Sequence, residues 1–166
     1  MRLETFQMVD RILSLDAEGG RILARAVIPR RSPVFYVHFP GFEVVPGVLL
    51  IETMAQVAGH LAMAQLGFEK MVFLAHVREA RFKRFVEPGD PLRVEATLIQ
   101  QGSMYAVLEA RLHRELAPEE LTLAATAEIR FTIGPFPNDT MRRAILDEAA
   151  RAGGGAPRDA TEQRDV

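Results

Sequence analysis

The longest apolar run of the chain lies between two turns and predicts one long helix. Pro46 and Gly47 precede this run, and Gly67 follows it. Proline is tolerated in the first turn of a helix, because the first amides have no intrahelical partner. A helix between these breaks would be about 30 Å long at 1.5 Å per residue, enough to span a small domain. Its surface is apolar on nearly all sides, which is typical of a helix buried in a protein core or in a membrane.

Polar residues on one face of this helix argue against a membrane span. Glu52, Gln56 and His60 are four residues apart and therefore share a face, and Gln65 is a further polar break. The length alone would permit a span, but a carboxylate in the middle of the helix would be costly in lipid. In a soluble core the same polar stripe can face a pocket. We therefore expect no membrane span.

Shorter runs on both sides of the helix predict strands. Residues 8–15 and 21–28 flank a Gly-Gly turn and predict a hairpin, and residues 29–33 predict a loop because they contain two prolines. After the helix, strand-like runs cover residues 71–85, 92–99, 105–112 and 121–133. Strands gathered around one long helix indicate an α+β fold, in which an antiparallel sheet wraps around the helix.

The segment after residue 134 has a different pattern. Pro135 and Pro137 end the sheet, and Asn138, Asp139 or Thr140 can cap a short helix that the glycines from residue 153 onward would end. The remaining tail is polar and lacks apolar periodicity. We expect one domain over residues 1–134, a helical extension over 135–152 and a disordered tail over 153–166.

Composition narrows the class of protein. A length of 166 residues favours a single domain with a real core, and a net charge of −2 gives no footprint for nucleic acid. The chain has no cysteine, which excludes disulfides and thiolate metal sites and fits a reducing compartment. The four histidines show no metal-binding spacing, so we expect no metal. The N-terminus lacks the apolar core of a signal peptide, so we expect a cytoplasmic protein.

Three residues around the start of the long helix converge on acid–base chemistry. His38 can exchange a proton near neutral pH. Gly47 lies where backbone N–H groups are unpaired and the helix dipole favours negative charge. Glu52 lies on the apolar helix, where desolvation should raise the pKa of its carboxyl group and favour the proton-donating form. A base, an oxyanion donor and an acid are the parts that proton abstraction next to a carbonyl requires.

The motifs that contain these residues resemble those of a known family. The chain has HFPG at 38–41, PGVL at 46–49 and IETMAQ at 51–56, with MVDRI at 8–12, ARFKR at 80–84 and PGD at 88–90. This pattern resembles the 3-hydroxyacyl-acyl-carrier-protein dehydratases of the FabZ type, which have the hotdog fold. The resemblance covers residues 6 to 134.

The resemblance implies a role for each residue of the site. His38 would remove a C2 proton, and the Gly47 amide, with Val48 beside it, would bind the thioester oxygen. Glu52 would protonate or position the departing C3 hydroxyl. From its place on the helix, we expect Gln56 to hold a polar partner or to orient Glu52 rather than react. The product would be a trans-2-enoyl thioester and water, with no cofactor, in fatty acid or related acyl-chain biosynthesis.

The resemblance also implies partners. It implies a homodimer in which His38 of one subunit faces Glu52 of the other, or a hexamer built as a trimer of dimers. Basic residues near the tunnel mouth of the family meet the acidic acyl carrier protein, which suggests a contact at Arg81, Lys83 and Arg84. A solvated strand face is the ordinary alternative. Strand alternation would place Arg81 and Lys83 on one face, with Arg78 and Arg84 on the other.

Four positions depart from the family pattern, and they keep two alternatives open. Val37, Glu43, Phe85 and His76 stand where other residues are usual in the family. The first alternative is a hotdog acyl thioesterase, in which the helix carboxylate activates water; the HFPG loop argues against it, because that chemistry needs no histidine there. The second is a non-catalytic subunit that binds the acyl carrier, and the four departures are its only support.

Overall fold

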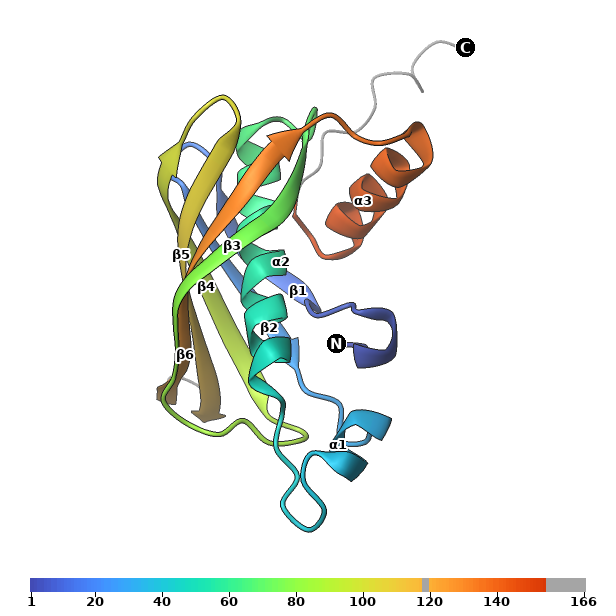
Figure 1. Ribbon diagram of the computed structural model, residues 1–166, viewed down its shortest axis with the longest axis vertical. Helices are drawn as coiled ribbons and strands as arrows, with labels where there is room; N and C mark the ends of the chain where they lie inside the picture. The colour runs from blue at the N-terminus through green and yellow to red at the C-terminus, as the bar shows by residue number, and fades with distance from the viewer. Residues whose placement is uncertain (118–119, 155–166) are drawn as a thin grey trace.

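A single antiparallel sheet wraps around one long helix in the computed structural model, which describes residues 1–117 and 120–154 (Figure 1). The helix is α2 (Gly47–Gln65). The strands are β1 (Arg11–Asp16), β2 (Arg21–Val27), β3 (Met71–Phe82), β4 (Pro91–Gln101), β5 (Tyr105–Ala117) and β6 (Glu120–Gly134). Their order in the sheet is β1-β2-β4-β5-β6-β3. The predicted α+β fold, with an antiparallel sheet around a central helix, is confirmed.

The core lies between α2 and the concave face of the sheet. Leu50, Met54, Val57 and Leu61 of the helix are fully buried. Alternate residues of β4 and β5 point at them, because successive side chains of a strand face opposite sides; the buried set is Leu92, Val94, Ala96, Ala106, Leu108, Ala110 and Leu112. By length and composition alone α2 could cross a membrane. In this structure 56% of that apolar stretch is buried inside the protein.

A short helix stands where the sequence predicted a loop. Helix α1 (Pro33–Val37) begins at Ser32, whose hydroxyl accepts a hydrogen bond from the Val34 amide at 3.4 Å. The loop prediction for residue 33 was wrong because proline fits the first turn of a helix as well as it fits a turn. A 3₁₀ turn, η1 (Leu3–Thr5), precedes the sheet.

A bulge in β3 overturns the predicted placement of the basic residues. Arg78 lies opposite Glu128 and Arg81 lies opposite Thr126, so three steps along β3 match two steps along β6. The extra residue reverses the alternation, and Arg78 and Arg81 therefore share a face of the sheet instead of lying on opposite faces. Glu79, inside the bulge, has a positive φ of 53°. Lys83 and Arg84 lie beyond the end of the strand, where the alternation no longer applies.

The C-terminal segment forms helix α3 (Asp139–Arg151), which lies alongside the C-terminal half of α2 (Figure 1). The side chain of Asn138 caps it by accepting a hydrogen bond from the Met141 amide at 2.8 Å. Gly153 and Gly154 continue from its end, with the Gly154 amide donating to the Ala149 carbonyl at 2.8 Å. The disordered tail was predicted to begin at residue 153; its residues 155–166 lie outside the described part of the chain.

Candidate active site

His38 follows α1 at the start of a closed loop. Its amide donates to the Phe35 carbonyl at 3.3 Å, and its own carbonyl accepts from the Val44 amide at 3.2 Å. Phe39 and Phe42 exchange two backbone hydrogen bonds of 3.0 and 2.9 Å, which close the loop between them. The imidazole is half-buried and stacks on the Phe39 ring, with 4.3 Å between the ring centroids. The loop therefore fixes the backbone of His38 and leaves one side of its ring accessible.

Gly47 is the first residue of α2. No side-chain hydrogen bond caps this helix, whose N-cap residue is Pro46. The first backbone amides lack intrahelical partners, and together with the helix dipole they favour a negatively charged group in front of the helix. The Phe82 ring covers Gly47 so closely that a Cβ atom there would lie 2.8 Å from the Phe82 Cζ atom. Glycine permits this approach. Val48 beside it is 70% exposed, so one side of the helix start is open.

Glu52 lies one and a half turns into α2 and is half-buried. Its Oε1 atom accepts a hydrogen bond of 2.9 Å from Nε2 of Gln56. Gln56 also donates to the Phe6 carbonyl at 2.6 Å and accepts from the Met8 amide at 3.0 Å. The side-chain amide of Gln56 thus joins the N-terminal segment to the carboxylate. Neither Phe6 nor Met8 could be predicted as a partner of Gln56, because both act through backbone atoms.

A cavity of about 380 Å³ opens beside Glu52 and continues along α2. Glu52, Gln56, His60 and Met63 line it on the helix side. The N-terminal segment, β3, β6 and α3 supply the other walls. Of the residues that the structure describes, His38 is not among those that line this cavity. In a single chain, the imidazole and the carboxylate therefore do not face each other across it.

His60 and His113 differ from His38 in their surroundings. Burial lowers the pKa of His60, and the nearby Gly154 carbonyl, 3.4 Å from Nε2, opposes the shift. The His60 ring meets Phe68 edge-on at 5.4 Å. Burial also lowers the pKa of His113, with Glu95 opposing it. Within residues 1–117 and 120–154, no group of three or more His, Cys, Asp or Glu side chains could hold a metal ion.

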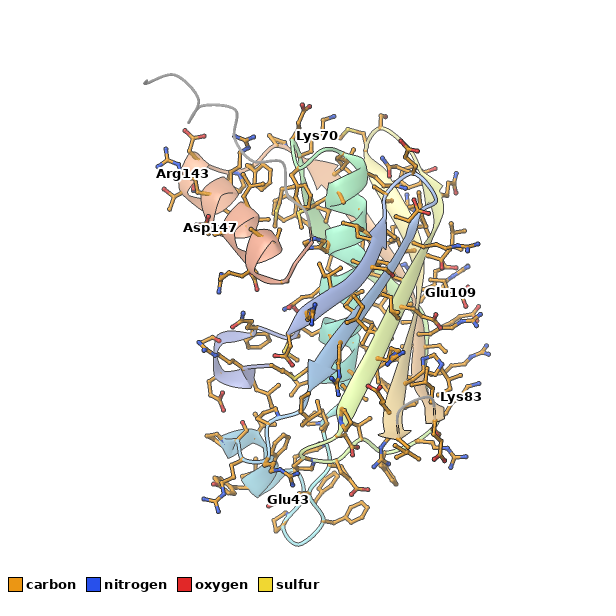
Figure 2. The ribbon with its side chains drawn as sticks, turned by 180° about the vertical axis from the view of Figure 1, so that it is seen from behind. Glu43, Lys70, Lys83, Glu109, Arg143 and Asp147 are labelled. Carbon is orange, nitrogen blue, oxygen red and sulfur yellow. The ribbon has the colours of Figure 1, made fainter. Side chains whose placement is uncertain are left out.

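The predicted acyl-carrier residues are all exposed. Arg81 pairs with Glu79 at 3.0 Å, and the amides of Lys83 and Arg84 both donate to the Ala124 carbonyl. Figure 2 shows Lys83 in the same half of the molecule as Glu43, the half where α2 begins, with Lys70 at the opposite end. Phe82, whose ring covers Gly47, lies between Arg81 and Lys83 in the chain, so this basic segment runs close to the start of α2.

The four positions that depart from the family pattern are also on the surface. Val37 is 76% exposed, and Glu43 and His76 are exposed as well. Phe85 meets Phe42 edge-on, with 5.7 Å between ring centroids, so it contacts the loop that follows His38. None of the four side chains is part of the core.

A family model and individual known proteins both match this chain, and they indicate the same family. The FabA-like domain family matches residues 2–118. A 3-hydroxyacyl-[acyl-carrier-protein] dehydratase FabZ of Desulforamulus reducens is 38% identical over 130 residues, covering 78% of this chain and 87% of that protein. The FabZ of Pelotomaculum thermopropionicum is 41% identical over 129 residues, covering 77% and 88%.

Similar solved structures agree on the fold. A thioesterase of Haemophilus influenzae has a TM-score of 0.57 and 16% identity, over 76% of this chain and 79% of that one. At this identity the likeness concerns the fold alone.

Proposed function

The chain belongs to the FabA-like family, and from this membership we propose that it dehydrates 3-hydroxyacyl thioesters of acyl carrier protein. The product is a trans-2-enoyl thioester, as in fatty acid or related acyl-chain biosynthesis. The observation that carries the proposal is Glu52, held by Gln56 at an apolar cavity, on the helix whose N-terminus is Gly47. A cytoplasmic location stays a prediction.

Each residue takes one part of the elimination. His38 accepts the C2 proton, which the neighbouring thioester carbonyl makes acidic. The amide of Gly47 donates to the carbonyl oxygen as negative charge develops there. Glu52, in its protonated form, gives its proton to the C3 hydroxyl. The C3–O bond then breaks, the C2–C3 double bond forms and water leaves. Transfer of the proton from His38 back to Glu52 completes the cycle.

The active site is shared between two protomers. His38 does not line the cavity of Glu52 in its own chain, so the base comes from the other protomer of a homodimer. Tyr36, Val37, Phe39 and Phe42 expose large apolar side chains around His38, and such a patch is typical of an interface. Strand β3 is an edge of the sheet and can pair with a second copy.

Acyl carrier protein is the macromolecular partner. Its acidic surface meets Arg81, Lys83 and Arg84, which are exposed and adjoin Phe82, the residue that covers Gly47 at the start of α2. Such contacts steer association and weaken as salt is added. The basic residues therefore act on binding of the carrier rather than on the chemistry.

Substitution of the two ionisable residues tests the reaction. The full-length protein is incubated with 3-hydroxyacyl and saturated acyl thioesters, and enoyl product and free thiol are measured. His38→Ala and Glu52→Gln should each lose about 10²- to 10⁴-fold in kcat/KM, the usual contribution of a general acid or base. Glu109→Gln, on the outer face of β5, is the control and should keep full activity.

The same assay separates the alternatives. Release of free thiol from saturated substrates would indicate a thioesterase. Binding of acyl carrier without turnover would indicate a non-catalytic subunit. Full dehydration by either His38→Ala or Glu52→Gln would overturn the assignment of that residue.

A further inference from the structure

The cavity beside Glu52 extends well beyond the reacting groups. It follows α2 from Glu52 to Met63, and these eleven steps of 1.5 Å correspond to about 16 Å. Its polar groups on α2 are Glu52, Gln56 and His60, whereas the wall farther along includes Met63, Met71 and Leu74. A volume of about 380 Å³ lies at the lower end of the range for small-molecule sites. The cavity is therefore long, largely apolar and of limited capacity.

Helix α3 supplies one wall of this cavity. The cavity is lined by Ile145 and Ala149, on the face of α3 that packs on the domain, and by Ala152, which directly follows the helix. Ala149 is only 2% exposed, and the Ala152 carbonyl accepts a hydrogen bond of 2.6 Å from the Ile12 amide of β1. Arg143 and Asp147, labelled on α3 in Figure 2, are exposed on the surface of the helix. The contacts with β1 and the core fix α3 as a wall.

We propose that α3 sets the upper limit on the length of the acyl chain that the enzyme accepts. The inference rests on the proposed dehydratase function and names the substrate class of the same site. The C3 hydroxyl lies at Glu52, and the alkyl chain runs along α2 toward Met63 and Ile145. The FabA-like match ends at residue 118, so α3 lies outside the matched region.

Charged residues strengthen this limit. Glu148 and Arg151 of α3 also line the cavity. A chain too long for the apolar part would have to displace α3 or press its methyl end against these side chains and remove water from them, which is unfavourable. Medium chains are therefore preferred over long ones.

A substitution at Ile145 enlarges the cavity, and the same substitution at the adjacent residue Leu146 is the control. Ile145→Ala removes side-chain volume from the cavity wall, whereas Leu146→Ala removes a comparable volume from a partly buried residue of α3 that does not line the cavity. The ratio of kcat/KM for long to medium 3-hydroxyacyl thioesters should rise about tenfold in Ile145→Ala, the lower end of the effect of one methylene in an apolar pocket. The ratio should stay unchanged in Leu146→Ala.

A second substitution works in the opposite direction. Ala152→Leu adds volume to the same wall, so medium chains should lose about tenfold in kcat/KM relative to short ones. Because short substrates occupy only the part of the cavity near Glu52, their turnover reports folding and chemistry in every variant. An unchanged chain-length profile in both Ile145→Ala and Ala152→Leu would overturn the role of α3.

A binding measurement separates this inference from the proposed function. Saturated acyl-pantetheine thioesters of increasing length are titrated calorimetrically into the full-length protein and its variants. If no variant or wild-type protein dehydrates any substrate, the proposed function fails. A length cutoff in binding that moves with Ile145→Ala still supports α3 as the limit, and a cutoff that does not move rejects it.

Discussion

Gln56 uses its whole side-chain amide to hold Glu52 against the N-terminal segment. In Gln56→Leu, the Phe6 carbonyl and Met8 amide lose their partners, and the carboxylate is free to move. We expect kcat to fall about 10²-fold, since small misplacements of a catalytic group have effects of that size, and KM to stay nearly constant. The free energy of unfolding should fall by about 1–3 kcal/mol.

Gln65 provides the control for this positioning role, because it lies on the same helix and donates one hydrogen bond of 2.6 Å, to the Ala17 carbonyl. Gln65→Leu should lose stability without loss of kcat. Equal kinetic effects of the two substitutions would mean that Gln56 acts only through folding. The kinetic constants and chemical denaturation of both variants decide between these outcomes.

His60 makes stability depend on pH in a predictable direction. Burial holds its pKa in the folded protein below the ordinary value of 6.5. Above pH 6.5 both folded and unfolded chains hold a neutral imidazole, and below it the unfolded chain takes up the proton first. The free energy of unfolding therefore decreases as pH falls from 6.5 through the folded pKa.

The substitution His60→Gln should remove part of this pH dependence. Denaturation curves of both proteins, measured at several pH values, should show a smaller loss of stability on acidification in the variant. His113 contributes in the same direction, so His113→Gln is needed to separate the two. If the free energy of unfolding depends on pH in the same way in His60→Gln and in the wild type, the assignment to His60 is wrong.

The sequence predicts site residues where their chemistry lies in short motifs, and the roles of these residues stay predictions. The three candidate residues, His38, Gly47 and Glu52, are close together in the sequence. The regular geometry of an α-helix fixes how far Glu52 lies from the helix start at Gly47. Phe82 was not predictable as the cover of Gly47, because strand β3 brings it there from a distant part of the sequence. The separation of His38 from the cavity beside Glu52 likewise depends on the tertiary structure, so local sequence patterns do not predict it.

At the level of elements, strict periodicity gave the reliable predictions. The alternation of Leu92, Val94 and Ala96 follows the pleat and matches their burial. The β3 bulge could not be predicted, because an extra residue does not change the pattern of apolar residues in a recognisable way. The prediction that Arg78 and Arg81 lie on opposite faces of the sheet is therefore wrong. Helix α1 is too short to show a helical period.

Helix α3 depends on its N-cap. Asn138→Ala removes the acceptor of the Met141 amide, which should destabilise α3 by about 1 kcal/mol. Because α3 packs on the domain through one face, we expect amide exchange in residues 139–151 to accelerate about fivefold more than exchange in the sheet. Asn138→Asp keeps an acceptor and should behave like wild type. Uniform acceleration across the protein would show that α3 and the sheet unfold together.

For the whole molecule, the fold leaves two features that a second copy would complete. Among the residues that the structure describes, strand β3 is an edge of the sheet whose outer backbone groups have no strand partner, and the loop after α1 exposes aromatic side chains next to His38. Pairing of both features in a two-fold dimer would use the same surface of each protomer. Such a dimer yields two equivalent sites, each with a base from one chain and an acid from the other.

Mixed dimers test this shared arrangement directly. His38→Ala and Glu52→Gln chains, each inactive alone, are given different affinity tags, co-expressed and purified as the doubly tagged species. In a shared site, the first chain supplies an intact Glu52 and the second an intact His38, so one of the two sites is restored. The mixed dimer should therefore recover about half of the wild-type kcat, whereas same-variant dimers stay inactive. If both residues of a site came from one chain, every site would carry a substitution, and no activity would return.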